Sequence, residues 1–61
     1  MYKELKFRII REHGSQANFA MAVREDESTI SRVIHGRRSL PANKREKWAE
    51  ALKCKPQELF R

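Results

Sequence analysis

Five side chains that can form hydrogen bonds lie within nine residues in the middle of this chain. They are Glu27, Ser28, Ser31, Arg32 and His35. In an α-helix, which advances about 100° per residue, three of them (Ser28, Arg32 and His35) share one side, flanked by Glu27 and Ser31. Arg can bridge two acceptors on guanine, Glu can accept from the amino group of cytosine, and Ser can do either. A helix over 27–35 would therefore carry the chemistry needed to read base edges in a DNA major groove.

The opposite side of this helix is apolar, because Ile30, Val33 and Ile34 cluster within one sector. Asp26 is a good N-cap, and Gly36 is a usual helix stop. An ordinary solvated helix surface is the alternative interpretation, since short polar side chains are common there. A helix in front of this segment and a basic loop behind it favour DNA recognition.

Two helices are predicted ahead of it. Tyr2 to His13 places Leu5 and Ile9 four apart and Phe7 and Ile10 three apart, which indicates a helix with a broad apolar face that ends at Gly14. Ser15 then caps a short helix over about 15–23. Its inner side is formed by Phe19, Ala20 and Val23.

The rest of the chain predicts a fourth helix and a last turn. Leu40-Pro41 begins the helix, and Trp48, Ala49 and Leu52 form its apolar stripe. Lys55-Pro56 opens the last turn, and we expect Leu59 and Phe60 to fold back onto the core. Residues 1–61 are thus predicted to form one all-α domain, a compact bundle of four to five helices, with Trp48 in its core rather than stacked on a base.

The positive charge is concentrated in one stretch. The formal net charge is +6, and residues 32–47 hold six cations against Glu46 alone, where a merely solvated surface would spread them. Such a surface suits a polyanion, either nucleic acid or an acidic membrane. Contacts to a DNA backbone give affinity and register without reading sequence. The residues predicted to make them are Gln16, Thr29, Arg37, Arg38, Lys44 and Arg45.

Other classes of function find little support. The single Cys54 cannot form an intramolecular disulfide, and Cys54 with His13 and His35 has no zinc-ligand spacing. No Ser, His and Asp are fixed in a shared site, and no stretch has the length of a membrane span or the layout of a signal peptide. We therefore expect a cytoplasmic protein that is not an enzyme and uses no metal or cofactor.

The sequence resembles the small Cro and repressor-type (XRE-like) helix-turn-helix proteins of phages and prophages, over nearly the whole chain. The resemblance rests on the order and spacing of Gly14-Ser15-Gln16, Phe19-Ala20, Val23, Ser28-Thr29-Ile30-Ser31-Arg32-Val33, Gly36-Arg37-Arg38, Leu40-Pro41, Trp48-Ala49, Leu52 and Glu58-Leu59.

This resemblance implies a lambda-repressor-like helix-turn-helix fold whose recognition helix is 27–35. It implies that Gln16 contacts phosphate and that Glu27, Ser28 and Arg32 are the principal base-reading residues, with Ser31 and His35 nearby. Two residues depart from the family pattern. Arg24 stands where the turn usually has Gly, so it would need a positive φ, and Glu25 places an acid near the phosphates.

The expected function is a sequence-specific transcriptional regulator, such as a Cro-like repressor, that binds a two-fold double-stranded DNA operator as a homodimer. We expect the dimer surface around Leu40 and Phe60, although binding as a monomer stays open. The alternative is an antitoxin or other protein-interaction module on the same fold. A toxin would then be the protein partner, whereas a regulator that activates would contact the polymerase.

Overall fold

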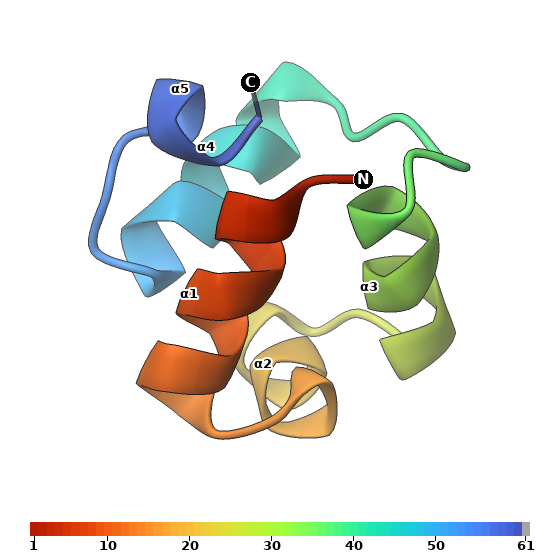
Figure 1. Cartoon of the computed structure of the whole chain (residues 1–61), viewed down its shortest axis with the longest axis vertical. Helices are drawn as coiled ribbons and strands as arrows, with labels where there is room; N and C mark the ends of the chain where they lie inside the picture. The colour runs from red at the N-terminus through yellow and green to blue at the C-terminus, as the bar shows by residue number, and fades with distance from the viewer. Residues whose placement is uncertain (61) are drawn as a thin grey trace.

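Helices form all the regular structure that the computed structural model describes, which covers residues 1–60. They are α1 (Lys3–His13), α2 (Gln16–Val23), α3 (Glu27–Ile34), α4 (Ala42–Ala51) and α5 (Pro56–Leu59), with no strand among the described residues (Figure 1). The prediction of a compact all-α protein with five helices is therefore confirmed. The longest helix, α1, has 11 residues, and no helix in the described part of the chain is long and apolar enough to cross a membrane.

The five helices surround one hydrophobic core. Trp48 and Phe19 are its largest members, both fully buried, and their rings meet edge to face with centroids 5.3 Å apart. The prediction that Trp48 is a core residue is thus confirmed. The core consists of Leu5, Ile9, Phe19, Ala20, Val23, Ile30, Val33, Ile34, Leu40, Trp48, Ala49, Leu52 and Leu59.

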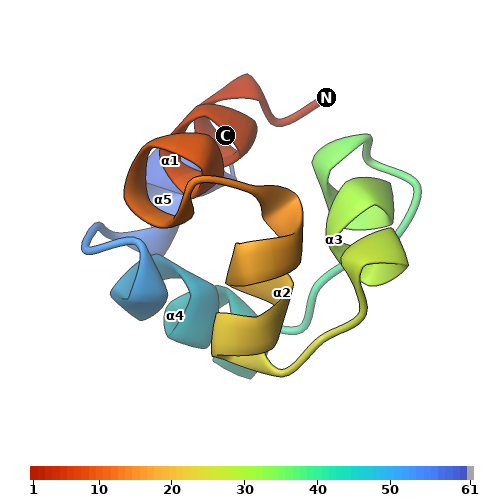
Figure 2. The ribbon, with the colours of Figure 1, turned by 90° about the horizontal axis from the view of Figure 1, so that it is seen from below.

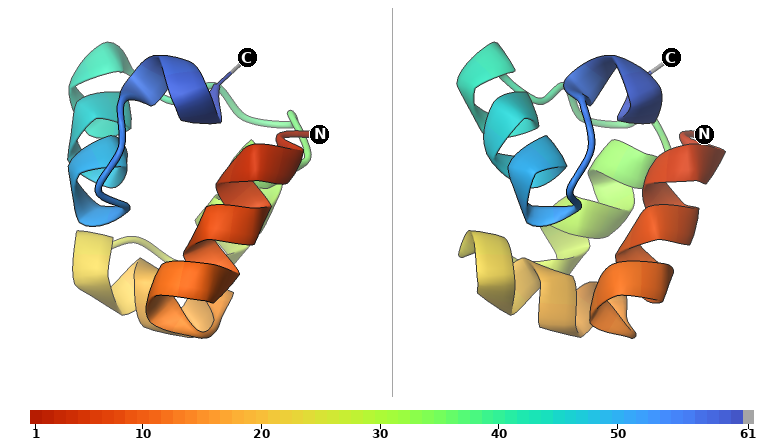
Figure 3. Two further views of the ribbon diagram at one scale, coloured as in Figure 1. Left: turned by 60° about the vertical axis from the view of Figure 1, so that its left-hand side comes forward. Right: turned by 90° about the vertical axis from the view of Figure 1, so that its left-hand side faces the viewer.

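Helices α1 and α2 each contact three other helices: α1 contacts α2, α3 and α5, and α2 contacts α1, α3 and α4. Seen from below, α1 and α3 lie on different sides of α2 (Figure 2). Figure 3 shows α2 across the bottom of the molecule and α5 at its top. Helix α3 is thus held by α1 and α2 while part of its surface stays uncovered.

The junction between α1 and α2 follows its sequence signals. Gly14 adopts the left-handed conformation (φ 85°), and its amide donates to the Ile10 carbonyl at 2.9 Å, which ends α1. The Ser15 hydroxyl then accepts from the Asn18 amide at 3.1 Å, as predicted for an N-cap. The His13 ring reaches across the molecule and its Nε2 lies 3.1 Å from the Ala51 carbonyl oxygen. Since that oxygen can only accept, Nε2 carries the proton.

One prediction for α1 was wrong. Leu5 and Ile9 are fully buried, but Phe7 is 58% exposed and Ile10 is 45% exposed. Phe7 lies roughly 200° around the helix from Leu5 at ~100° per residue, so these two pairs point in different directions. Only the Leu5 side meets the other helices, and α1 therefore has two apolar faces rather than one broad one.

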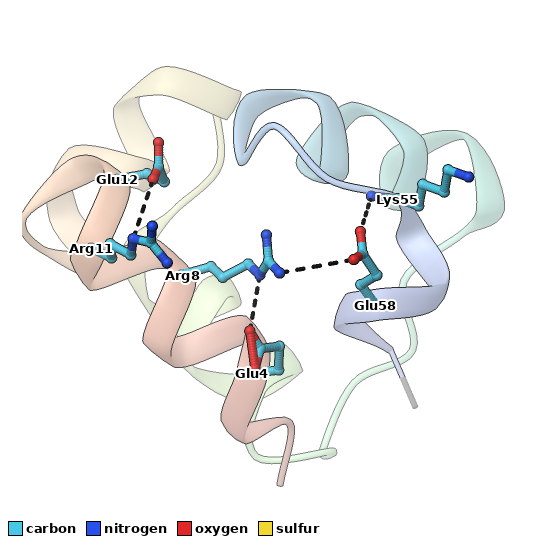
Figure 4. A network of polar contacts seen from close by, with 6 residues as sticks. All are labelled: Glu4, Arg8, Arg11, Glu12, Lys55 and Glu58. Atoms are coloured by element: carbon cyan, nitrogen blue, oxygen red, sulfur yellow. Dashed lines mark hydrogen bonds and ion pairs between the residues drawn. The ribbon is translucent and has the colours of Figure 1, made fainter.

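Polar contacts join α1 to α5 on the outside of the core (Figure 4). Arg8 Nε lies 2.9 Å from Glu4 Oε2, and Arg8 Nη2 lies 3.9 Å from Glu58 Oε1. Glu58 Oε2 also accepts from the Lys55 amide at 2.8 Å, which caps α5. The bond to Glu4 raises the pKa of Arg8. Burial raises the pKa of the nearby Cys54 thiol, and the Arg8 guanidinium opposes that effect.

The two ends of the described chain meet beside α3. The Tyr2 amide donates to the Ile34 carbonyl at 2.7 Å. The Tyr2 ring packs against the ring of Phe60, with centroids 5.4 Å apart, and the Arg45 guanidinium lies 5.3 Å from the Phe60 centroid. Phe60 is thus half-buried and folds back onto the core, as predicted.

Candidate nucleic-acid interface

A three-residue turn, 24–26, sets the direction in which α3 leaves α2. Arg24 lies in the left-handed region (φ 58°, ψ 48°), which is the positive φ expected there. The Arg24 amide donates to the Met21 carbonyl at 3.3 Å and the Glu25 amide to the Ala20 carbonyl at 2.9 Å. These two bonds form a Schellman motif, in which glycine usually holds the left-handed position. The backbone bonds therefore hold the turn despite the side chain on Arg24.

Helix α3 starts where Asp26 was predicted to cap it, with one difference. The backbone of Asp26 is extended (φ −77°, ψ 146°), and its carbonyl accepts from the Ile30 amide at 3.1 Å. The Asp26 side chain makes no capping hydrogen bond. The predicted cap is thus confirmed in position and backbone geometry but wrong in its side-chain bond.

The inner side of α3 anchors it to the core. Ile30 and Ile34 are fully buried and Val33 is 1% exposed. This burial is the one predicted from the spacing of the three residues, and it fixes which side of α3 faces solvent.

Helix α3 ends at Ile34, one residue before the predicted end, so its outer side carries four of the five residues predicted to read bases, and His35 follows as its C-cap. Glu27, Ser28, Arg32 and His35 are exposed, and Ser31 is half-buried. At ~100° per residue they span an arc of roughly 140°. Within residues 1–60 none of these five side chains has a hydrogen bond or ion pair to another side chain, so each is available to an external partner.

The loop after α3 places two of the predicted backbone-binding cations beside it. Gly36 is left-handed (φ 76°), and the Arg37 amide donates to the Arg32 carbonyl at 2.9 Å, which ends α3 in a second Schellman motif. Arg37 and Arg38 are exposed. Arg38 Nη1 lies 3.5 Å from the Thr29 hydroxyl oxygen, a long hydrogen bond that leaves its other donors available.

Thr29 differs from the other predicted backbone-binding residues, because it is only 7% exposed. Its hydroxyl accepts from Arg38. We therefore interpret Thr29 as a residue that positions Arg38 along α3 rather than one with a broad surface of its own for phosphate.

Lys44 and Arg45 already have partners within the molecule. Lys44 Nζ lies 2.9 Å from Glu25 Oε2, which ties the first turn of α4 to the turn between α2 and α3. Arg45 Nε donates to the Leu40 carbonyl at 2.8 Å, and its guanidinium lies over Phe60. The carboxylate of Glu25 is thus paired rather than a lone acid. Both cations are more constrained than the sequence prediction assumed.

Two further residues complete the predicted set. Gln16 is the first residue of α2 and is half-buried, next to the cap Ser15, and its contact to phosphate stays a prediction. Leu40 was expected near a dimer surface, but it is 5% exposed and belongs to the core. Of the two residues predicted for the dimer surface, only Phe60 is therefore accessible to solvent.

Sequence reasoning missed the pairs Glu25–Lys44 and Thr29–Arg38. Their members are 19 and nine residues apart, so no local helical spacing signals them. By contrast, the pair Glu4–Arg8 is four residues apart and has the spacing that joins side chains on one helix.

No protein-family model matches the sequence, and neither curated proteins nor solved structures provide a match. Over residues 1–60 there is no group of three or more His, Cys, Asp or Glu side chains placed to hold a metal ion, and no surface pocket.

Proposed function

We propose that this protein is a sequence-specific, double-stranded DNA-binding transcriptional regulator of the helix-turn-helix type, a Cro-like repressor, with α3 as its recognition helix. The observation that carries the proposal is the outer side of α3. It presents Ser28 and Arg32, with His35 at the C-cap, without intramolecular side-chain partners, while Ile30 and Ile34 hold the opposite side in the core.

The dimensions of α3 support this function. Its eight residues form an α-helix, which is about 10–12 Å across with its side chains, and a major groove roughly 12 Å wide admits a helix of that diameter. Arg32 would then bridge the two acceptors of a guanine. Glu27 would accept from a cytosine amino group, and Ser28 would bond to either base edge.

The cations around α3 support contacts to the DNA phosphate backbone. Arg37 and Arg38 follow the helix directly and are exposed, so they can contact phosphates on either side of the groove that α3 occupies. Such contacts make the affinity fall steeply with salt, by a slope of ~0.9 per phosphate neutralised. Gln16 at the start of α2 would add a neutral contact to the same backbone.

We further propose that two copies bind a two-fold operator. The molecule measures 23 × 22 × 20 Å along its principal axes, whereas half-sites one helical turn apart are separated by ~34–36 Å. A single copy therefore reaches one half-site, and a homodimer on DNA reaches both.

A binding titration with three variants tests the proposal. The protein is titrated against the DNA upstream of its own gene and against an unrelated duplex, at several salt concentrations, with binding followed by fluorescence anisotropy. The variants are Arg32→Ala, Arg37→Gln and the control Lys53→Gln. Lys53 is an exposed cation in the turn between α4 and α5. That turn lies on the other side of the molecule from α3 (Figure 1).

We expect affinity for the upstream DNA to exceed nonspecific affinity by ~10³ or more. Arg32→Ala should reduce that ratio. Arg37→Gln should weaken both duplexes and reduce the salt slope by about 1, whereas Lys53→Gln should change neither. Equal, weak binding to both duplexes that Arg32→Ala leaves unchanged would contradict the proposal.

A further inference from the structure

The outer face of α1 has a composition that the proposed function does not use. Phe7 and Ile10 are 58% and 45% exposed, and residues three apart on a helix are neighbours on its surface. They are two of the four large exposed apolar side chains among residues 1–60, with Met1 and Met21. Large exposed apolar patches with a polar rim mark interaction sites, and because this pair is small, the charges around it decide what it fits.

Cations surround this pair. At ~100° per residue, Lys3 and Lys6 lie about 20° to 100° from Phe7 and Ile10, and Arg11 borders them on the other side. Lys3 and Lys6 have no ion pair within residues 1–60, and the Arg11 Nε lies 3.9 Å from Glu12 Oε2. We call the surface formed by these five residues the α1 face.

The carboxylates on α1 do not neutralise the two lysines. Glu4 is held by Arg8 at 2.9 Å (Figure 4), and Glu12 is nearest to Arg11. The α1 face therefore combines an apolar centre with a positive rim, and its electrostatic complement is a surface with an apolar centre and an acidic rim.

A second copy of this chain is a poor complement. Each copy has a formal charge of +6, and a symmetric contact through the α1 face would bring the lysine rims of both copies together. We propose that the α1 face binds a partner protein through an acidic amphipathic segment, one whose apolar side chains contact Phe7 and Ile10 and whose carboxylates pair with Lys3, Lys6 and Arg11.

The place of the α1 face in the fold allows this contact while α3 is occupied. Helices α1 and α3 lie on different sides of α2 (Figure 2), and Phe7 and Ile10 take no part in the core. A partner on the α1 face therefore need not cover the outer side of α3. The inference does not depend on what α3 binds.

The test is a titration of the isotope-labelled full chain with a synthetic amphipathic helix that has a leucine stripe flanked by Glu. A matched peptide with Lys in place of every Glu is the control ligand, and vesicles of phosphatidylserine and phosphatidylcholine are the membrane control. Amide chemical shifts locate the contact, and sedimentation of the protein alone measures self-association. The variants are Phe7→Ser and Lys6→Glu, each on the α1 face.

Each variant has a matched control elsewhere on the surface. Met21→Ser removes an apolar side chain that is 79% exposed on α2. Lys47→Glu makes the same charge change on α4, where Lys47 is exposed.

We expect the Glu peptide to shift the amides of residues 3–11. Phe7→Ser should weaken the binding about tenfold, which corresponds to ~1.4 kcal/mol. Lys6→Glu should also weaken it, by a larger factor at low salt than at high salt. Met21→Ser and Lys47→Glu should bind as the parent does. The inference is overturned by equal binding of the Lys peptide, by shifts confined to residues 32–47, by binding to vesicles but not to the Glu peptide, or by self-association that Phe7→Ser abolishes.

Discussion

Arg24 holds a backbone conformation that side chains other than glycine rarely adopt. Its φ of 58° costs an L-residue roughly 1–2 kcal/mol. The two backbone bonds of the Schellman motif hold it there. The residue that links α2 to α3 is therefore a point at which the native state is strained.

Replacing Arg24 with Gly should stabilise the protein. The left-handed position is free of strain for Gly, and the gain is reduced by the entropy of Gly in the unfolded chain. We expect the free energy of unfolding to rise by about 0.5–1 kcal/mol, and Tm to rise by a few degrees, since 1 kcal/mol is worth roughly 4–8 °C at this size. The fluorescence of Trp48, the only tryptophan, reports unfolding in urea.

Lys53 provides a matched control for this prediction. It has the same φ of 58°, and it ends α4 with the same pair of bonds, from the Lys53 amide to Glu50 and from the Cys54 amide to Ala49. Lys53→Gly should therefore stabilise by a similar amount. If both Gly variants were less stable than the parent, the left-handed conformation at these positions would be wrong.

At the scale of elements, α1 shows that the burial of a side chain does not follow from its hydrophobicity alone. Ile9 and Ile10 are adjacent and chemically identical, yet Ile9 is fully buried and Ile10 is 45% exposed. Ile9→Val should lower the free energy of unfolding by about 0.5–1.5 kcal/mol. Ile10→Val should change it by less than about 0.5 kcal/mol. Urea unfolding measures the change in the free energy of unfolding for each variant. Equal decreases would contradict the two separate faces and favour the single broad apolar face.

The helices could be predicted from the sequence because their signals are local. Gly14 and Ser15 mark helix ends within a residue of where the structure has them, and Gly36 lies two residues beyond the end of α3. The inner side of α3 follows from the spacing of Ile30, Val33 and Ile34. These signals need no knowledge of the neighbouring helices.

What could not be predicted depends on packing between distant parts of the chain. The exposure of Phe7 and Ile10 is decided by which side of α1 the other helices meet. Lys44 is constrained because α4 begins beside Glu25. The burial of Leu40 likewise follows from the path between α3 and α4, which no local spacing specifies.

At the scale of the whole molecule, the size of the protein limits how it could occupy DNA. With 23 Å along its longest axis, one copy is shorter than the ~34 Å between half-sites one turn apart. If two copies touch on an operator, binding of the second should depend on the rotational position of its half-site.

Inserting about half a helical turn, ~5 bp, between the two half-sites should therefore remove cooperative binding. Inserting a full turn returns the half-sites to one side of the duplex but about 34 Å further apart, more than a copy 23 Å long can bridge. It should therefore remove the cooperativity as well, and the original spacing is the control. Gel-shift titrations count the bound copies and measure the cooperativity. If cooperative binding persisted after the half-turn insertion, the proposed symmetric pair would be excluded.

The contact between the Tyr2 and Phe60 rings also means that the order of the helices along the chain can be changed. Because residues 2 and 60 lie together, a short linker could join the two ends of the described chain, and a new start could be opened between the exposed Arg38 and Ser39. This circular permutant would read α4, α5, α1, α2, α3. The chain would then end just beyond α3, so that a fused enzyme or dye would be held next to whatever α3 binds.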